Sequence, residues 1–529
     1  MKNDNINPLL RMDYPDPDVI RVGDTYYMVS TTMYFMPGCE ILRSYDLRNW
    51  EHAAFVYERL DSTPAQRMED GKNIYGQGMW AASLRWHEDC FYVIFVANDT
   101  QKTYLYRSKS IEGPWEKSEI EGFYHDNSLL FDDDGRVYIV YGNRDIHLTE
   151  LEADLSGPKK GGLDRVILVD RDDAYLGYEG AHFYKINGKY YIFFIHMPKA
   201  TARRTESCFV ADSLEGEFRG GDVCGDDRGY CGSGVAQGGI VDTPEGDWYA
   251  ILFQDSGAVG RIPILLPVHW KEGEEIPVFG EKGRVPESFP IPEGRPGYVY
   301  EPLAGSDDFK DVPAAADTEE EYKRKHESFG FKSRWQFNHE PELKLISRDT
   351  SAGTVRISTD RLSKNLVQAK NILTQRSSWP DSAAEVTVDA SGLKEGDYAG
   401  LCLLESAYAF IALTRREGEL WLVMKTRKAP EGLWGERNDE TPGDEQEAVK
   451  LKKGSSVRLR AEADFMRMKD TARLHYIEDG AKKPLGGEAK LVFKLDHFTG
   501  VRFGLFVFST REAGGSAVFS DFAYEKQEV

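Results

Sequence analysis

Carboxylates recur at one position relative to a repeated tyrosine in the first half of the chain. Asp126 and Glu179 each stand 12 residues before such a tyrosine, and Asp16 stands 11 residues before the first one. Trp80 and Gln237 stand 12 residues before two further tyrosines. If the repeats surround a common axis, side chains at equivalent points converge on one site. We expect that site to be functional, because three clustered carboxylates without a use would be unfavourable.

Carboxyl groups that face one another across a site can hydrolyse a glycosidic bond with inversion. One group, protonated, acts as an acid at the leaving oxygen, and a second activates a water on the opposite sugar face, roughly 6.5–9.5 Å away. A third carboxylate raises the pKa of the acid by like-charge repulsion. Trp80 offers a ring face for stacking against a sugar. The alternative is that these residues only begin strands and bond local backbone groups.

Five short runs of β-branched and aromatic residues position these side chains. Each run follows a polar turn, and the runs contain Tyr27, Tyr92, Tyr138, Tyr191 and Tyr249. The tyrosines are 65, 46, 53 and 58 residues apart, which is close to the period of a four-stranded propeller blade. Helical periodicity is nearly absent from this half. Residues 1–300 are therefore predicted to form a five-bladed β-propeller.

The composition changes after the fifth run, where proline, glycine and charged residues dominate. We predict a linker over residues 301–328. Beyond it, short strand-like runs return at regular spacing with polar turns between them, a pattern typical of a β-sandwich. Because the five-unit repeat does not continue, residues 329–529 are predicted to form a separate sandwich domain. The predicted fold class is all-β.

Charge and composition exclude several classes of partner. The 529 residues carry a formal net charge of −22. A field of this sign repels phosphate backbones and anionic lipids, so we expect neither nucleic acid nor membrane as a partner, whereas a neutral oligosaccharide is not disfavoured. The N-terminus lacks the apolar core of a signal peptide, so the expected location is cytoplasmic. Six cysteines without a CxxC pair indicate reduced thiols. A homo-oligomer is left open.

The motifs around the three carboxylates resemble those of glycoside hydrolase family 43. This family contains β-xylosidases and α-L-arabinofuranosidases with a five-bladed propeller and a C-terminal, concanavalin A-like β-sandwich. The opening motif at residues 14–18 implies that Asp16 is the general base. The motif at residues 179–182 implies that Glu179 is the general acid, and Asp126 matches the carboxylate that tunes and orients that acid.

The same resemblance implies substrate-binding residues. Segments 32–38 and 78–81 are similar to those that line the sugar subsite, which implicates Phe35 and Trp80, and segment 257–261 implicates Arg261. A sandwich loop at residues 496–498 would close one side of the pocket with Phe498. Gln237 is a further binding candidate.

The metal requirement is less well defined by the resemblance. Gln237 stands where many members have a histidine associated with an axial calcium ion. We therefore predict no metal ligands and no required cofactor, and leave calcium open.

The predicted function is an inverting exo-glycosidase that releases xylose, arabinose or both from xylo- or arabinoxylo-oligosaccharides. The choice of pentose stays open, because a pocket that does not bond the distinguishing group discriminates by only a few kcal/mol. One alternative is a retaining fructosidase on a related propeller, although its Asn-Asp-Pro motif is missing at residues 14–16. A second is a non-catalytic carbohydrate-binding protein, which would need no acid of raised pKa.

Overall fold

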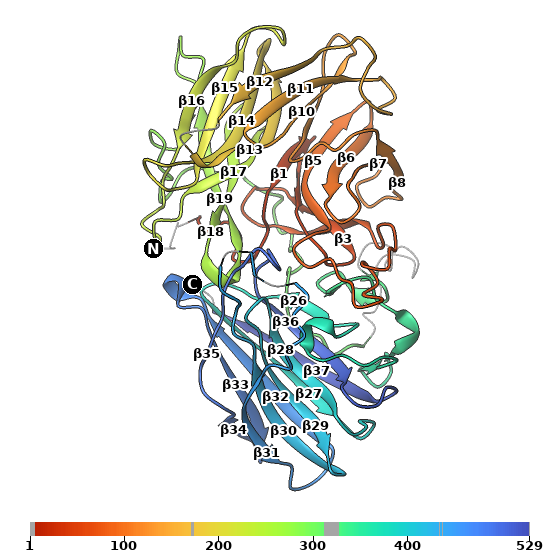
Figure 1. Cartoon of the computed structure of the whole chain (residues 1–529). Helices are drawn as coiled ribbons and strands as arrows, with labels where there is room; N and C mark the ends of the chain where they lie inside the picture. The colour runs from red at the N-terminus through yellow and green to blue at the C-terminus, as the bar shows by residue number, and fades with distance from the viewer. Residues whose placement is uncertain (1–5, 171–173, 311–326, 433, 436, 528–529) are drawn as a thin grey trace.

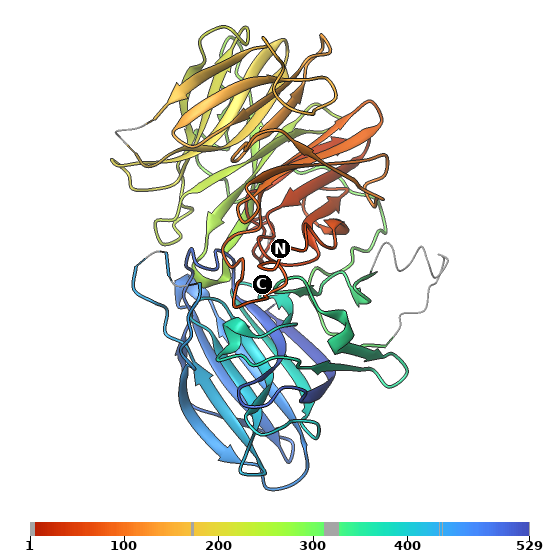
Figure 2. The ribbon, with the colours of Figure 1, turned by 45° about the vertical axis from the view of Figure 1, so that its right-hand side comes forward.

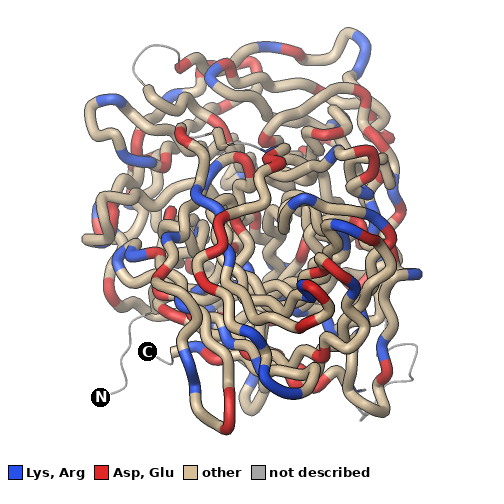
Figure 3. Tube along the Cα trace, turned by 60° about the horizontal axis from the view of Figure 1, so that its bottom comes forward, with Lys and Arg blue, Asp and Glu red and all other residues tan. Residues whose placement is uncertain are grey.

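The computed structural model describes residues 6–170, 174–310, 327–432, 434–435 and 437–527 and divides into a propeller and a sandwich (Figure 1). The regular elements of these residues are strands and short 3₁₀ turns, so the all-β prediction is confirmed. The 3₁₀ turns are η1 (Gly257–Val259), η2 (Leu343–Leu345), η3 (Leu366–Gln368) and η4 (Met466–Met468). In the described part of the chain, no helix has the length and apolar character needed to span a membrane. Basic positions are interspersed with acidic ones along the trace (Figure 3).

Five antiparallel sheets of four consecutive strands form the blades. Blade I contains β1 (Asp18–Val22), β2 (Thr25–Ser30), β3 (Gly38–Ser44) and β4 (Glu51–Tyr57). Blade II contains β5 (Met79–His87), β6 (Cys90–Ala97), β7 (Lys102–Ser108) and β8 (Glu116–Ile120). Blade III contains β9 (Ser128–Phe131), β10 (Val137–Tyr141), β11 (Asp145–Leu151) and β12 (Asp164–Val169).

The remaining two blades follow the same order. Blade IV contains β13 (Ala174–Ile186), β14 (Lys189–Pro198), β15 (Thr205–Ala211) and β16 (Arg219–Cys224). Blade V contains β17 (Val235–Asp242), β18 (Trp248–Asp255), β19 (Arg261–His269) and β20 (Val278–Phe279). The first strand of each blade is innermost, and β1, β5, β9, β13 and β17 contact one another around the ring. The five predicted aromatic runs form the second strands, which are largely buried because neighbouring blades cover both of their faces.

The ring closes between blades I and V through the N-terminal segment and side chains. The Leu9 N–H donates to Pro263 O at 2.9 Å, so the segment before β1 runs beside β19. The Arg21 guanidinium of β1 pairs with Asp242 of β17 at 2.5 Å. These contacts hold the first and last blades together. They therefore also fix the ends of the inner strands that carry the predicted site.

The sandwich consists of two antiparallel sheets. The first has the order β23 (Gln336–Phe337), β26 (Leu373–Arg376), β36 (Arg502–Ser509), β28 (Asp397–Leu404), β29 (Ala409–Arg416), β30 (Glu419–Thr426) and β31 (Asp444–Lys450). The second has the order β24 (Ile346–Asp349), β25 (Thr354–Ser358), β37 (Ser516–Lys526), β27 (Asp381–Asp389), β32 (Ser456–Asp464), β33 (Thr471–Glu478) and β34 (Ala481–Pro484), and β35 (Ala489–Lys490) also pairs with β33. A hairpin of β21 (Glu327–Ser328) and β22 (Phe331–Lys332) precedes them.

The segment between the domains packs on the propeller. Residues 280–310 run back over blades V and I, where the Tyr249 hydroxyl donates to Pro290 O at 2.8 Å and the Tyr45 N–H donates to the Tyr300 hydroxyl at 2.9 Å. Of the predicted linker 301–328, residues 311–326 lie outside the described residues.

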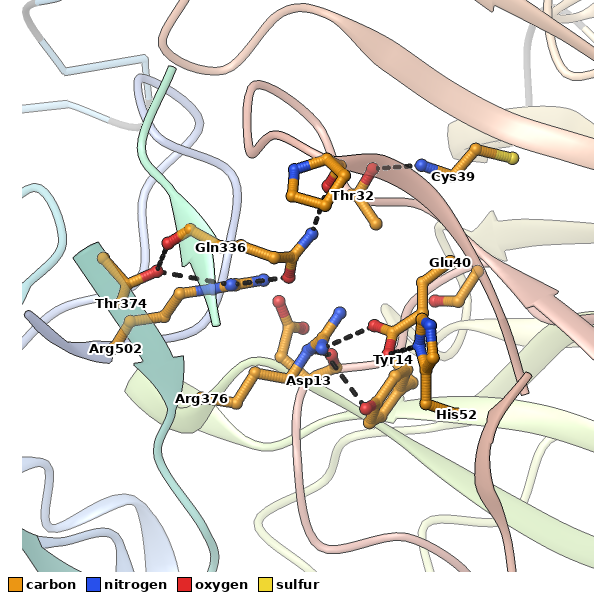
Figure 4. Close-up of polar contacts among 12 residues, drawn as sticks. Asp13, Tyr14, Thr32, Cys39, Glu40, His52, Gln336, Thr374, Arg376 and Arg502 are labelled. Carbon is orange, nitrogen blue, oxygen red and sulfur yellow. Dashed lines mark hydrogen bonds and ion pairs between the residues drawn. The ribbon is translucent and has the colours of Figure 1, made fainter. Parts of the chain in front are cut away.

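Figure 2 shows the propeller and the sandwich in contact along one junction. Side chains of both domains belong to one apolar core there. A buried polar network crosses this junction (Figure 4). The Arg376 guanidinium of β26 pairs with Glu40 of β3 at 2.7 Å and donates to the backbone oxygen of Asp13 at 2.8 Å. Burial alone would raise the pKa of Glu40, but Arg376 and His52 lower it to about 2. The two domains are therefore joined by ionic as well as apolar contacts.

Replacing Arg376 by alanine is expected to destabilise the fold strongly. The Glu40 carboxylate, which is 2% exposed, would lose its guanidinium partner. Breaking a buried ion pair from one side costs about 3–5 kcal/mol. Denaturant unfolding measures this loss. The matched control is Arg473→Ala, which removes an exposed pair with Glu488 and should cost under about 1 kcal/mol. Equal losses in both variants would contradict the role of Arg376.

Candidate active site

A cavity of about 670 Å³ opens where the inner strands of the propeller meet the sandwich. Seven of the eight predicted site residues line it: Asp16, Trp80, Asp126, Glu179, Gln237, Arg261 and Phe498. Blades I to V each contribute at least one of these residues, and the sandwich contributes Phe498. The repeat therefore converges on one site, as its phase predicts.

Unusual backbone geometry aims the predicted side chains into the cavity. Asp16, Asp126 and Gln237 have φ angles of 53°, 50° and 65°, in the left-handed region that non-glycine residues rarely adopt. Glu179 lies between two register shifts in the pairing of β13 with β14. Bulges of this kind re-aim side chains, and backbone strain concentrates at functional sites.

Asp16 forms a buried ion pair with Arg261. The Arg261 Nη1 atom donates to Asp16 Oδ1 at 2.9 Å, and the two residues are 3% and 7% exposed. The Arg261 guanidinium also lies 4.4 Å from the centre of the Phe498 ring. Asp13 accepts the N–H groups of Arg261 and of Gly500, each at 2.7 Å. A loop of the sandwich therefore takes part in holding the partner of the predicted base.

Asp126, Glu179 and His125 form a cluster of titratable side chains. One ligand atom from each lies within 4.8 Å of the other two. Burial raises the pKa of Asp126 to about 7, and the charges of Glu179 and Asp16 act in the same direction, while His125 opposes them. The Asp126 carboxylate in turn raises the pKa of His125 to about 9, against the effect of burial. The sequence predicts like-charge repulsion at the acid, Glu179, whereas in the structure burial together with like-charge repulsion raises the pKa of the neighbouring Asp126.

Several residues of the cavity were not predicted. His125 lies 3.9 Å from Glu179 Oε2, and Asn143 donates a hydrogen bond to the same oxygen. Arg204 pairs with Asp255 at 2.5 Å beside them. A second set of equivalent positions in the repeat contains part of this group. After four of the repeated tyrosines, the residue five or six positions later lines the cavity; these residues are Met33, Asn143, Met197 and Asp255.

The structure does not bring Phe35 to the cavity, which corrects its predicted place in the sugar subsite. Phe35 is 1% exposed, and the Arg502 guanidinium lies 3.5 Å from the centre of its ring. The loop that carries it pairs with the sandwich through Met36 and Phe337 instead. Phe35 is therefore a residue of the domain junction.

His125, Asp126 and Glu179 are the group among the described residues whose ligand atoms lie close enough together to hold a metal ion. This set offers a ring nitrogen and two carboxylates. Calcium prefers roughly six to eight oxygen ligands, so the set fits that ion poorly.

The inner strands also offer calcium a poor site. The Gln237 amide packs against Gly180, where an added Cβ would lie 2.6 Å from Gln237 Cδ. Between the inner strands, the Arg85 guanidinium donates to Asp18 at 2.7 Å and to Ser128 at 2.6 Å. A fixed cation already pairs with one oxygen of the buried Asp18 carboxylate there.

The raised pKa values make stability depend on pH. Folding raises the pKa of Asp126 from 3.8 to about 7 and that of His125 from 6.5 to about 9. At these two groups the folded chain therefore binds more protons than the unfolded chain from about pH 4 to pH 9, so their contribution to stability falls as pH rises through this window. Asp126→Asn should remove most of this dependence. Relative to wild type, the free energy of unfolding of the variant should increase between pH 5 and pH 8 on the order of 2 kcal/mol.

Denaturant unfolding at both pH values measures this difference. The matched control is Asp479→Asn, which changes an exposed aspartate on the sandwich. Its difference from wild type should not vary with pH. A pH-independent difference for Asp126→Asn would contradict the assigned shifts.

Family comparisons agree with this architecture. The family model for glycosyl hydrolases family 43 matches residues 6–275, and that for the beta xylosidase C-terminal concanavalin A-like domain matches residues 326–525. The chain belongs to glycosyl hydrolases family 43.

Individual relatives are moderately similar. A beta-xylosidase of Formosa agariphila is 26% identical over 68% of this chain and 62% of its own length. Xylosidase/arabinosidase 43B of Humicola insolens is 25% identical over 98% of this chain and 97% of its own. The solved structure of a bifunctional GH43-CE protein of Bacteroides eggerthii has a TM-score of 0.86 and 39% identity, over 99% of this chain and 64% of that one. The chain spans about half to two thirds of the length of the first curated relatives it matches.

Proposed function

We propose that the chain is an inverting exo-glycosidase that releases xylose, arabinose or both from xylo- or arabinoxylo-oligosaccharides. The observation that carries the proposal is the convergence of Asp16, Asp126 and Glu179, from three different blades, on one cavity with Arg261 bound to Asp16. The names of relatives such as xylosidase/arabinosidase 43B support the choice of pentoses.

In this mechanism Glu179 is the general acid and Asp16 the general base. Glu179 protonates the leaving oxygen, and Asn143 and His125 beside its carboxyl group hold it in place. Asp16 takes a proton from the attacking water, and the Arg261 guanidinium fixes the orientation of its carboxylate. Asp126 places a third titratable group next to the acid. The two reacting carboxyl groups need a gap of roughly 6.5–9.5 Å to admit the water.

The shape of the cavity supports terminal attack. The sandwich residues Phe493, Leu495 and Phe498 line one side of it, opposite the blades. The Phe498 ring lies 5.5 Å from the Trp80 ring, so the two enclose part of the site. A cavity closed on one side admits the end of a chain more readily than its middle.

Side-by-side release of xylose and arabinose tests the proposal. The substrates are an aryl β-D-xylopyranoside and an aryl α-L-arabinofuranoside, with Asp16→Ala as the control. Release that disappears in the control supports a glycosidase, and the ratio of rates identifies the preferred pentose. No release from either substrate by a folded protein would overturn the exo-pentosidase proposal.

A further inference from the structure

Two aromatic side chains of the described residues are far more exposed than the others. Tyr175 and Trp434 expose 60% and 71% of their surface, and both line the active-site cavity. Large aromatic rings contribute most to stability when they are buried, so two strongly exposed rings at one cavity are informative. That the two most exposed rings lie at the same cavity points to a ligand that covers them.

Tyr175 is held in place by the propeller. It lies in β13, four residues before Glu179, and its neighbours Ala174 and Leu176 pair with β14. The Arg144 guanidinium donates to the backbone oxygen of Tyr175 at 3.1 Å. Strand pairing and this hydrogen bond fix the backbone that presents the ring.

Trp434 is held in place from both domains. It lies between β30 and β31 of the sandwich, and the next residue, Gly435, has a φ of 59°. An added Cβ at Gly435 would lie 2.3 Å from Asp496 Cγ, so the backbone packs tightly against that side chain. The Asn73 amide of the propeller donates to Arg437 O at 3.2 Å and to Asn438 Oδ1 at 2.7 Å. The exposed ring is therefore mounted on an anchored segment.

The exposed fractions of the lining residues show which end of the cavity is deep and which is open to solvent. The carboxylates of Asp16 and Asp126 belong to residues that are 7% exposed, at the inner end, whereas the two rings form the outer end. An exo-acting enzyme holds the terminal sugar at the inner end, so its leaving group lies at the outer end. The C–H face of a sugar ring packs against an aromatic face, whose negative charge attracts the hydrogens. The volume of about 670 Å³ also exceeds the lower bound of roughly 300 Å³ for ligand pockets.

We propose that Tyr175 and Trp434 form a binding site for the sugar leaving group. This inference rests on the proposed function, because it assumes that the inner end cleaves a glycosidic bond. It assigns recognition of the sugar leaving group to two rings, one from each domain.

The test compares kcat/KM on two substrates that differ in the leaving group. Xylotetraose, or its arabinosyl-substituted form if arabinose is preferred, carries a chain of sugars there, whereas the corresponding glycosyl fluoride carries none. For Trp434→Ala and Tyr175→Ala, the loss on the oligosaccharide should exceed the loss on the fluoride by about tenfold or more. Trp434→Tyr and Tyr175→Phe keep an aromatic ring, so they should retain most of the wild-type kcat/KM on the oligosaccharide. Val299→Ala, at an 85% exposed site outside the cavity, should change neither rate.

Equal losses on both substrates, or no loss on the oligosaccharide, would overturn the proposal. If wild type cleaves neither substrate, the proposed function has failed, and calorimetric binding of xylotetraose to the full chain then tests the rings separately. Weaker binding by about tenfold in Trp434→Ala would support the binding site. Equal binding by wild type and variant, or no binding by wild type, would exclude it.

Discussion

Glu179→Gln is expected to lower kcat/KM on xylo-oligosaccharides by about 10²–10⁴-fold. The glutamine keeps the shape of the side chain and can still accept the hydrogen bond that Asn143 donates, but it has no proton to give to the leaving oxygen. An activated aryl glycoside has a leaving group that departs without protonation. The decrease in kcat/KM on this substrate should therefore be much smaller. The measurement is kcat/KM for both substrate classes with wild type and variant.

The matched control is Glu88→Gln, which changes a glutamate whose side chain is 83% exposed at a turn of blade II. It should leave both rates unchanged. A loss in Glu179→Gln of equal size on both substrate classes would argue against Glu179 as the acid, because a binding or structural defect does not depend on the leaving group.

The propeller could be predicted because its signal is local and repeated. Each polar turn followed by an aromatic, β-branched run became the second strand of a blade, from Tyr27 in β2 to Tyr249 in β18. These strands are buried between neighbouring sheets, so their composition is nearly uniformly apolar. The phase of the carboxylates then identified the cavity, since equivalent strands begin around one axis.

Contacts between distant segments could not be predicted in the same way. Phe35 was expected at the sugar but packs under Arg502, 467 residues later in the chain, because its loop faces the sandwich. Trp434 has no repeat or motif around it, and only the docking of the sandwich brings it to the cavity. Sequence spacing carries information about repeats within one domain. It carries none about which loops of a second domain meet them.

The junction also connects the sandwich to the predicted base. Asp13 bonds the backbone of Arg261 with one carboxylate oxygen and that of Gly500 with the other, and its own carbonyl accepts from Arg376. Two hydrogen bonds therefore connect sandwich segments to Asp13, and a third connects Asp13 to Arg261, which holds Asp16. The position of the predicted base depends on both domains.

Asp16→Asn is expected to lower kcat/KM by about 10²–10⁴-fold on every substrate, including those with activated leaving groups. The amide oxygen can still accept from Arg261 Nη1, so the buried guanidinium keeps a hydrogen-bond partner, but asparagine cannot take a proton from water. Attack by water is needed whatever the leaving group, and this separates the expected pattern from that of Glu179→Gln. Steady-state rates on xylo-oligosaccharides and aryl glycosides measure both patterns.

Product stereochemistry supplies the independent check on Asp16. If Asp16 activates water directly, the sugar first released by wild type has the opposite anomeric configuration to the substrate, which NMR during the first minutes of reaction detects. Retained configuration would mean that a carboxylate attacks the sugar itself, which requires the two groups to lie about 5–5.5 Å apart. In that case Asp16 would be the nucleophile, and the water that the inverting mechanism places between it and the sugar would have no role in the first step.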